Sequence, residues 1–472
     1  MAFTDRFYNR GSISTGFNIE NSIKFESGNR EYLRWTNFSG NASSARKKKF
    51  SMSLWCKRTK LSGQMIIWST AANGYLSFEA DDEIKWFQTY GGSQKKLNTT
   101  RVFRDMTAWY HIVVAVDSTQ STEAHRMRLY INGVEETDFV SATYPDQNAE
   151  AQNIYEQHLL LGEWGGGASG FNGYVADYLF VSEVQLVPTD VGEYDEDSGI
   201  WKPKDYEGTI SSPSHFLEFE DGSALGNATS GLNANYLENV AAADQATDTP
   251  TNNFAIMNPL IPTYGSTPFL YKNGATEIKR DPDDSGGWMT ITSTMAVNKG
   301  KWYAEFEVLE SPSLTMYGYA SLALIQGLAT PAFYLGTTTA SAGYYSNGDG
   351  ANDAIYHNAS DFPTAGVQSA AGTVISVAMD CDNNKIHFAN NGTYTNSSNP
   401  ANNTNGFAMV DDYVYFAHSS YTGNKTYKTN LGGYTTDGIS SAASDANGHG
   451  TFEYAPPTGY YALCTKNLAE YG

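Results

Sequence analysis

The feature that most constrains the fold of this chain is an alternation of apolar and polar residues with a period of two. In residues 50–57 every second side chain is apolar, and similar alternation recurs over 110–116, 127–131 and 302–308. Successive side chains of a β-strand point to opposite faces of a sheet, so this period is typical of strands with one buried face. No window keeps an apolar stripe at helical spacing over three turns. The pattern therefore predicts an all-β protein.

The turns between these segments indicate how the strands pair. Asn132-Gly133 and Asn391-Gly392 each follow an alternating segment, and Asn-Gly is a strong signal for a two-residue hairpin. Many short strands separated by Gly, Asn and Asp turns are typical of antiparallel sandwiches. We predict two antiparallel jelly-roll β-sandwiches, with less than about a tenth of the chain in helices.

Composition suggests where the chain divides. Residues 188–262 are rich in Asp, Asn, Thr and Ala and contain one clear strand, at 215–219. Such a composition is typical of a boundary between domains. Residues 1–20 carry few apolar positions. We predict an N-terminal arm over 1–20, a first sandwich over 21–187, an irregular connector over 188–262 and a second sandwich over 263–472.

Charge and apolar run lengths exclude several classes of partner. The net charge is −21, which argues against nucleic-acid binding because Lys and Arg dominate that affinity. The longest apolar runs, such as 112–116, are too short to cross a bilayer, and no secretory signal is visible. We predict neither nucleic-acid binding nor membrane insertion.

The three cysteines, Cys56, Cys381 and Cys464, lie far apart with no CxxC pair. They are expected to be small buried or free thiols rather than a disulfide or zinc framework. The chain is therefore expected to be made and kept in a reducing compartment, unless lysis releases it.

One basic run, Arg46 to Lys49, precedes the strand at 50–56. Charged residues beside a strand commonly guard it against pairing with another edge. The alternative is a contact with an anionic glycan or an acidic neighbour. The first interpretation is favoured, because runs of like charge are usually solvated.

Several stretches resemble known families. The first half resembles laminin-G, or concanavalin A-like, domains at Phe50–Arg58, Ala108–Asp117, Arg126–Glu136 and Gly170–Phe180. The second half resembles a SPRY-like sandwich at Gly300–Val308 and Thr373–Gly392. Both folds carry many functions, so the fold alone does not determine what is bound.

The order of these parts, with the joining segments 192–203 and 248–260 and the C-terminal stretch, resembles virion proteins of marine tailed bacteriophages. The resemblance implies a structural protein on the virion surface, synthesised in the host cytoplasm, as a tail fibre or tail-associated protein. It leaves a head-decorating protein or head fibre open. It implies contacts with other virion proteins, a homo-oligomer, and binding to host-surface polysaccharide. The tail or head location, the oligomeric state and the glycan stay open.

An enzyme is the competing class, because concanavalin A-like sandwiches include glycanases with paired carboxylates. Their active strand resembles Glu-x-Asp-x-x-Glu, which places the acids on one face. The nearest match runs from Glu193 to Ser198, and Ser198 stands where the last acid is needed. Glu305 and Glu307 share a strand face but follow from ordinary alternation. We predict that the protein is not an enzyme, with a glycan depolymerase as the alternative.

No cofactor or metal ligand set is predicted. The eight histidines form no HxH or HExxH motif. Residues 380–384 suggest a Ca²⁺ loop but lack its sixth-position Gly and twelfth-position Glu, so a tight turn is favoured. Laminin-G relatives often hold Ca²⁺ at the rim of the sandwich. That resemblance leaves Ca²⁺ open, with no ligands assigned.

Two loops are candidate recognition surfaces for a glycan. Trp164 lies among the glycines of 162–167, and Tyr344, Tyr345 and His357 lie in a stretch rich in Asn, Asp and Gly. Aromatic rings give rigid contact area beside adaptable polar groups. The alternatives are a rim tryptophan folded back on the sandwich and a long loop with no binding role.

Overall fold

The computed structural model describes residues 16–36, 42–61, 63–70, 73–155, 157–164, 169–196, 198–260, 269–280, 287–310, 314–327, 333–346, 353–364, 367–421, 425–434 and 439–472. Strands account for 45% of the chain and helices for 8%. The predicted all-β class and low helical content are therefore confirmed. The expected arm, 1–20, lies outside the described residues except for 16–20, where Ile19 is buried and Phe17 packs against the same cluster.

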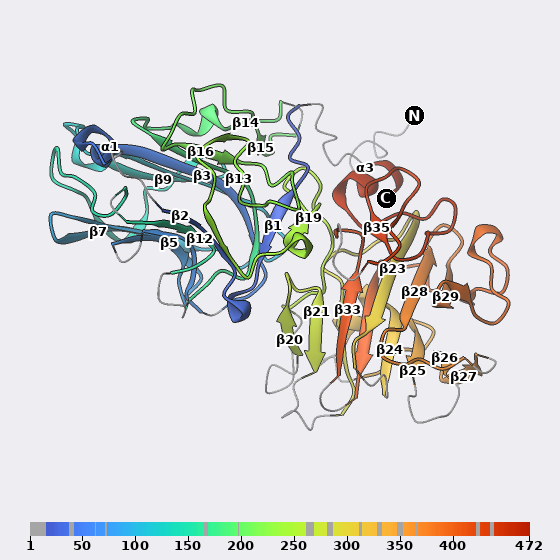
Figure 1. Ribbon diagram of the computed structural model, residues 1–472. Coiled ribbons are helices and arrows are strands. Elements are labelled where there is room, and N and C mark those ends of the chain that lie inside the picture. Colours follow the sequence, from blue (N-terminus) through green and yellow to red (C-terminus); the bar gives the residue numbers. More distant parts are fainter. Residues whose placement is uncertain are drawn as a thin grey trace. The chain divides into compact units, whose positions relative to one another are not determined.

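The chain divides into two compact units, residues 14–252 and 253–472, called here the N-terminal and C-terminal units (Figure 1). The predicted boundaries placed a separate connector between two sandwiches. The structure instead places a single division between Asn252 and Asn253.

The N-terminal unit contains two antiparallel sheets. The sheet named here after β3 has the order β10 (Val134–Glu135), β9 (Met127–Ile131), β8 (Tyr110–Asp117), β3 (Lys49–Arg58), β13 (Gly173–Ser182), β1 (Ser22–Phe25) and β19 (Gln245–Ala246), with β16 (His215–Leu217) on β13 and β17 (Ser230–Gly231) on β16. The β5 sheet has the order β11 (Phe139–Thr143), β7 (Ser93–Val102), β6 (Glu83–Tyr90), β5 (Gly74–Phe78), β4 (Met65–Thr70), β12 (Leu159–Leu161), β2 (Tyr32–Trp35) and β18 (Tyr236–Glu238).

Smaller elements complete this unit. They are α1 (Ser44–Lys48), the 3-10 turns η2 (Ser27–Asn29), η3 (Glu123–His125), η4 (Pro188–Asp190) and η5 (Ala242–Asp244), and a hairpin of β14 (Gly192–Tyr194) and β15 (Trp201–Pro203). Ser43 begins α1, because its side chain accepts a hydrogen bond from the Arg46 backbone N–H.

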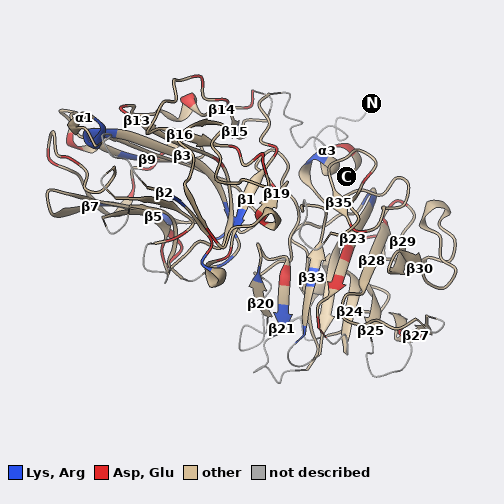
Figure 2. Cartoon of the chain, in the orientation of Figure 1, with Lys and Arg blue, Asp and Glu red and all other residues tan. Residues whose placement is uncertain are grey.

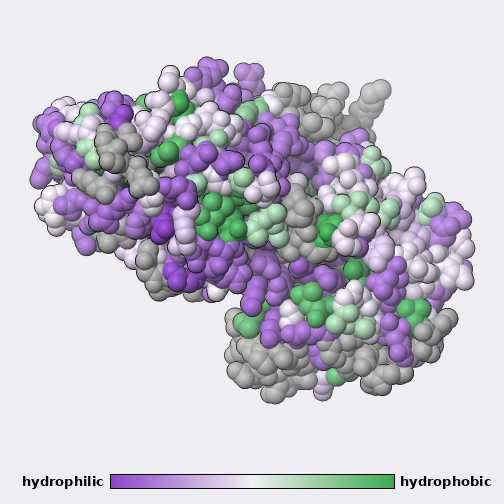
Figure 3. All heavy atoms as spheres, in the orientation of Figure 1, coloured by the Kyte–Doolittle hydropathy of each residue, from purple (hydrophilic) through white to green (hydrophobic). Residues whose placement is uncertain are grey.

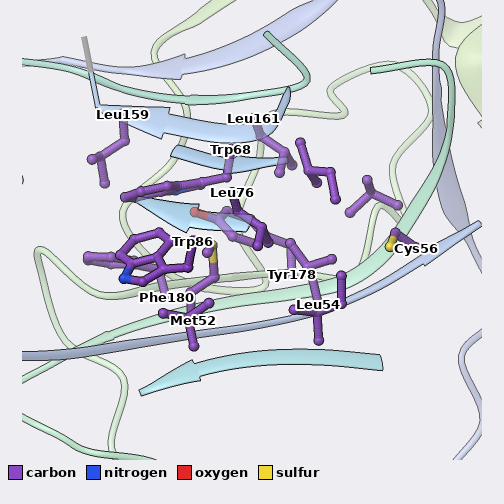
Figure 4. Packing of buried hydrophobic residues seen from close by; sticks show 14 of the residues in the cluster. Met52, Leu54, Cys56, Trp68, Leu76, Trp86, Leu159, Leu161, Tyr178 and Phe180 are labelled. Atoms are coloured by element: carbon purple, nitrogen blue, oxygen red, sulfur yellow. The ribbon is translucent and has the colours of Figure 1, made fainter. Parts of the chain in front are cut away.

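The inward faces of the two sheets form one aromatic core. Trp68 and Trp86 of the β5 sheet lie 5.4 Å apart between ring centroids, and Trp68 stacks on Phe180 of the β3 sheet at 6.3 Å (Figure 4). All three side chains are fully buried. The alternating apolar residues of β3 point into this same core. The period-two pattern in the sequence therefore identified a strand and its buried face correctly.

The segment expected to be an irregular connector, 188–262, is largely part of the N-terminal unit. Its strand β16 pairs with β13, β19 pairs with β1, and β18 pairs with β2. His215 of β16 lies in the core, stacked on Trp35 at 4.4 Å and on Phe180 at 5.3 Å. Strands this short, paired with partners distant in sequence, show little alternation of apolar and polar residues. The composition of the segment therefore suggested a linker.

The C-terminal unit also contains two main antiparallel sheets. The β23 sheet has the order β20 (Phe269–Lys272), β21 (Glu277–Arg280), β33 (Thr426–Asn430), β23 (Lys301–Val308), β28 (Val374–Asp380), β29 (Lys385–Asn390) and β30 (Thr393–Tyr394), with β31 (Phe407–Ala408) on β29. The β24 sheet has the order β22 (Met289–Thr292), β32 (Val414–Ser420), β24 (Thr315–Ser321), β25 (Ser341–Ser346), β26 (Ala354–His357) and β27 (Ser360–Pro363). The remaining elements are α2 (Leu322–Gly327), η6 (Pro400–Asn402), the hairpin of β34 (Ala443–Ser444) and β35 (Thr451–Phe452), and α3 (Thr465–Tyr471).

The outer face of β23 is covered rather than solvated. Glu305, expected to point to solvent by simple alternation, is 3% exposed. Its carboxylate accepts hydrogen bonds from the backbone N–H groups of Glu453 and Tyr454, both at 2.8 Å. Burial raises the pKa of this carboxyl to about 7. The C-terminal segment is therefore fastened to the sheet through a buried acid.

The three cysteines are free and buried, as predicted. Within the described part of the chain, no helix is long and apolar enough to cross a membrane.

Candidate ligand-binding surfaces

A row of paired residues crosses the outer face of the β5 sheet. The register runs Tyr236, Arg34, Leu160, Ser69, Tyr75, Phe87 and Lys96, each directly opposite the next on the neighbouring strand. Residues directly opposite in an antiparallel pair share a face. The adjacent positions, such as Trp68 and Leu76, belong to the core. The row therefore lies on the outer face.

Trp164, predicted as a recognition residue, lies at one part of this row. Its ring meets Tyr75 edge to face, with centroids 5.2 Å apart and planes at 83°, and both side chains are partly exposed. Lys85 Nζ lies 5.2 Å from the Tyr75 centroid. The preceding residue fixes the loop, since Ser69 Oγ donates to the Glu163 carbonyl at 2.7 Å. Trp164 thus folds back on the sheet and still presents part of its ring.

A second aromatic group lies at the other part of the row. The Arg34 guanidinium lies over the Tyr236 ring, 4.1 Å from its centroid, and Tyr236 is 41% exposed. Four strand spacings of about 4.8 Å separate β18 from β5, so Tyr236 and Tyr75 lie about 19 Å apart along the row. The middle of the row, at Leu160 and Ser69, is buried. Two aromatic groups therefore lie on either side of the loop that carries Glu163. We call them the aromatic platforms: Trp164 with Tyr75, and Tyr236 with Arg34.

Tyr344 is not a surface residue, contrary to our prediction. It lies on β25 with its ring in the core, fully buried. Its hydroxyl donates to Asp353 Oδ2 and accepts from Asn390 Nδ2, both at 2.9 Å. A buried phenol with both hydrogen bonds made is part of the sandwich, so Tyr344 cannot contact a glycan.

Removing that hydroxyl tests the structural role. The variant Tyr344→Phe is expected to lose about 1–2 kcal/mol of unfolding free energy, because the buried Asp353 and Asn390 groups each lose a partner. Chemical denaturation of the full chain measures the loss. Tyr413→Phe, at a 43% exposed position, is the control and should change stability by less than about 0.5 kcal/mol. Equal effects of the two variants would contradict the assignment.

Tyr345, the next residue, points to the opposite face of β25 and is partly exposed. Its ring lies 6.2 Å from Trp288 and 5.3 Å from Tyr356. Trp288 also contacts Tyr334, at 5.4 Å. The structure therefore places one predicted residue in an aromatic group whose other members sequence reasoning did not identify.

His357 lies apart from that group. It is partly exposed at the end of β26, with Nε2 2.9 Å from the Ala408 carbonyl oxygen and its ring 5.8 Å from Phe407. Phe362, 39% exposed, packs on the same Phe407 ring at 5.1 Å. His357 is therefore held by β31 in a small separate cluster.

The acidic run that resembles a glycanase strand lies in the β14–β15 hairpin. Glu193 and Asp195 both pair with Lys202 Nζ, at 3.3 and 3.4 Å. Hydrogen bonds from the Ser198 backbone and side chain lower the Asp195 pKa to about 2. A carboxyl this acidic stays ionised near neutral pH, so it cannot act as a general acid.

The basic run before β3 is matched by acids of the same unit (Figure 2). Arg46 pairs with Glu183 at 3.3 Å, Lys47 with Glu150 at 2.9 Å, and Lys49 with Asp117 at 3.0 Å. Lys47 also lines a cleft of about 370 Å³ whose walls include Lys95, Asp146 and Glu150. The edge-guard interpretation is wrong, because β3 is paired on both sides, with β8 and β13, and has no open edge. The mixed charges also argue against a site for an anionic glycan.

The turn at 380–384 is held by protein groups. Asp380 pairs with Lys301 at 3.0 Å, and its Oδ1 accepts from the Asn383 backbone N–H at 3.0 Å. In the described ranges, no group of three or more His, Cys, Asp or Glu side chains could hold a metal ion.

Part of the N-terminal unit is similar in sequence to a known protein family. Residues 27–190 match the family model of the concanavalin A-like lectin/glucanases superfamily. This segment is similar to concanavalin A-like domains. It includes Trp164, most of the cross-strand row and the β3 strand on which the laminin-G resemblance was noted. No curated protein matches the sequence.

Several solved structures are similar in fold. The SPRY domain of human HERC1 shares 18% identity, with 37% of this chain and 96% of that chain covered and a TM-score of 0.27. The TRIM65 PSpry domain shares 12% identity, covering 38% and 92%, with a TM-score of 0.29. A putative carbohydrate-binding protein from Bacteroides ovatus shares 14% identity with this chain. The alignment covers 36% of this chain and 45% of that protein, with a TM-score of 0.28.

Proposed function

We propose that this protein is a non-catalytic, carbohydrate-binding structural protein on the surface of a tailed-phage virion. The match of 27–190 to a lectin and glucanase superfamily supports carbohydrate binding. The resemblance of the order of parts to phage virion proteins supports the location, with a tail role preferred to a head-decorating one. The observation that carries the binding is the pair of aromatic platforms on the outer face of the β5 sheet.

Sugars suit this surface because each ring has apolar C–H faces edged by hydroxyls. Trp164 with Tyr75, and Tyr236 with Arg34, each place an aromatic plane beside a group that can donate hydrogen bonds. The separation of about 19 Å along the row suits a chain of several sugars rather than a monosaccharide. Figure 3 shows one face of the molecule, on which the described residues are mostly hydrophilic with small separate apolar patches.

The acidic groups considered for hydrolysis support a non-catalytic role. Retaining and inverting glycosidases need one carboxyl that is protonated near neutral pH beside a second ionised one. The ionised Asp195 lies in an ion-paired hairpin. Glu305, one of the carboxyls whose pKa burial raises, is buried beneath backbone N–H groups.

Shallow sites of this kind bind weakly, because little area is buried and ordering a loop costs free energy. Many copies on one particle would raise the avidity without new contacts. A symmetric homo-oligomer held by contacts with other virion proteins would supply these copies.

The variant Trp164→Ala is expected to weaken binding of host-envelope polysaccharide by about tenfold, because it removes most of one platform. Binding of the purified protein to immobilised polysaccharide measures this. Tyr413→Ala, which removes an exposed ring of the C-terminal unit, is the matched control and should bind normally.

Unchanged binding by Trp164→Ala would refute the role of this surface. Release of reducing sugar from the polysaccharide would instead favour the depolymerase. Mass spectrometry of purified phage particles tests the location, and the absence of its peptides would refute the virion assignment.

A further inference from the structure

Four aromatic rings of the C-terminal unit form a closed circuit, called here the four-ring cluster. Its members are Trp288, Tyr334, Tyr345 and Tyr356. Successive centroids lie 5.4 Å (288 to 334), 6.2 Å (334 to 356), 5.3 Å (356 to 345) and 6.2 Å (345 to 288) apart. The planes of successive rings meet at 48°, 85°, 77° and 59°. Neighbouring rings are therefore inclined to one another and are not stacked.

The cluster is held by regular structure. Tyr345 and Tyr356 lie on paired strands, since Gly343 is opposite Tyr356. The segment that carries Tyr334 is fastened to the β24 sheet, because Thr290 Oγ1 donates to the Phe333 carbonyl at 2.6 Å and the Leu335 N–H donates to Ser419 Oγ at 3.2 Å. Rings fixed in this way lose little conformational entropy when a ligand binds.

The cluster is accessible from solvent and lies on an apolar floor. All four rings are partly exposed, and Met316, Ala320, Leu335 and Ala417 are buried against them. Tyr421, 37% exposed, extends the aromatic surface at 5.6 Å from Trp288.

The dimensions and the charge favour a cation. Neighbouring centroids lie 5.3–6.2 Å apart, so a cation placed over the cluster can lie within the roughly 6 Å limit for attraction to more than one ring face. The cluster itself contains no Lys or Arg, and Asp361 lies opposite Tyr356 in the strand register. The chain as a whole carries a net charge of −21, which attracts cations.

We propose that the four-ring cluster binds a quaternary ammonium group, such as the head group of choline. A trimethylammonium group is a weakly hydrated cation with an apolar surface, so it suits a surface made of aromatic rings better than a primary ammonium does. This activity lies in the C-terminal unit and does not depend on glycan binding by the N-terminal unit.

The test compares choline with 3,3-dimethylbutan-1-ol, in which carbon replaces the charged nitrogen. Titrations of the full chain, followed by tryptophan fluorescence and calorimetry, are expected to show that choline binds at least about tenfold more tightly than the neutral alcohol. Equal binding of the two, binding of neither, or displacement of choline by a neutral oligosaccharide would each overturn the proposal.

Variants locate the site. Trp288→Leu and Tyr345→Leu each remove one ring and are expected to weaken choline binding by about tenfold or more. Tyr356→Phe keeps its ring and should bind within about threefold of the unchanged protein. Trp164→Leu, on the N-terminal unit, is the matched control and should leave choline binding unchanged. Near-ultraviolet circular dichroism identifies variants that fail to fold, and the two Leu variants are independent of each other. Loss of choline binding in Trp164→Leu, or normal binding in both folded Leu variants, would contradict the assignment.

Discussion

Replacing Asp248 by alanine is expected to lower the unfolding free energy of the N-terminal unit by about 3–5 kcal/mol. Asp248 Oδ2 lies 2.8 Å from Lys57 Nζ, and its Oδ1 accepts from Trp109 Nε1 at 3.1 Å. The Lys57 side chain is 0% exposed and that of Asp248 is 2% exposed. Alanine would leave a buried ammonium without its carboxylate, and that cost exceeds the loss of the pair itself.

Denaturant unfolding followed by tryptophan fluorescence measures this loss, because seven of the nine tryptophans precede residue 253. Glu207→Ala, at an exposed acid of the same segment, is the control and should cost less than about 0.5 kcal/mol. The double variant Lys57→Met with Asp248→Leu should recover most of the stability, since it removes both charges. Equal stability of Asp248→Ala and the unchanged protein would contradict the role given to this pair.

The stability conferred by His111 is expected to fall by about 2 kcal/mol between pH 6.5 and 5, and by about 4 kcal/mol by pH 3.5. His111 is stacked on Trp55 at 4.6 Å, and its Nδ1 accepts from Trp201 Nε1 at 2.9 Å. Burial lowers its pKa from 6.5 to about 3. Below pH 6.5 the His111 imidazole is protonated in the unfolded chain, whereas in the folded chain it stays neutral until the pH approaches 3. Acid therefore favours unfolding.

The variant His111→Phe keeps the stacked ring and cannot titrate. Its stability relative to the unchanged protein isolates His111 from Glu31, whose pKa burial raises to about 7 and which shifts stability in the opposite direction. We expect the stability gap between the two proteins to narrow as the pH falls from 6.5 to 3.5, measured by denaturant unfolding at several pH values. A gap that is constant with pH would contradict a neutral buried histidine.

Much of the fold follows from local pattern. The alternation in β3, β8, β9 and β23 predicted strands that the structure contains, because each has one face in a core. The connector was not predicted correctly. Its strand β16 lies within the strand predicted at 215–219. The strands β18 and β19 are only three and two residues long, and their partners are distant in sequence, so no local period reveals them.

Which residues form the candidate binding surfaces depends even more on the pairing of strands that are distant in sequence. Adjacent tyrosines on one strand point to opposite faces, so one of Tyr344 and Tyr345 had to be buried, but the sequence does not say which. Trp288 contacts Tyr345, and Tyr334 contacts Trp288, only through strand pairing and a fastened loop. Tyr236 lies beyond the family match, on a strand that composition had assigned to a linker.

The return of the chain through β18 and β19 also covers one edge of each sheet in the N-terminal unit. Each of these strands lies at the end of its sheet, beside β2 and β1. A fragment that stopped at residue 190, where the family match ends, would leave β1 and β2 as open edges with unpaired backbone N–H and C=O groups. Open edges pair with other chains. The segment after residue 190 therefore acts as a built-in protection against aggregation, and the smallest self-contained piece of this unit extends to about Asn252.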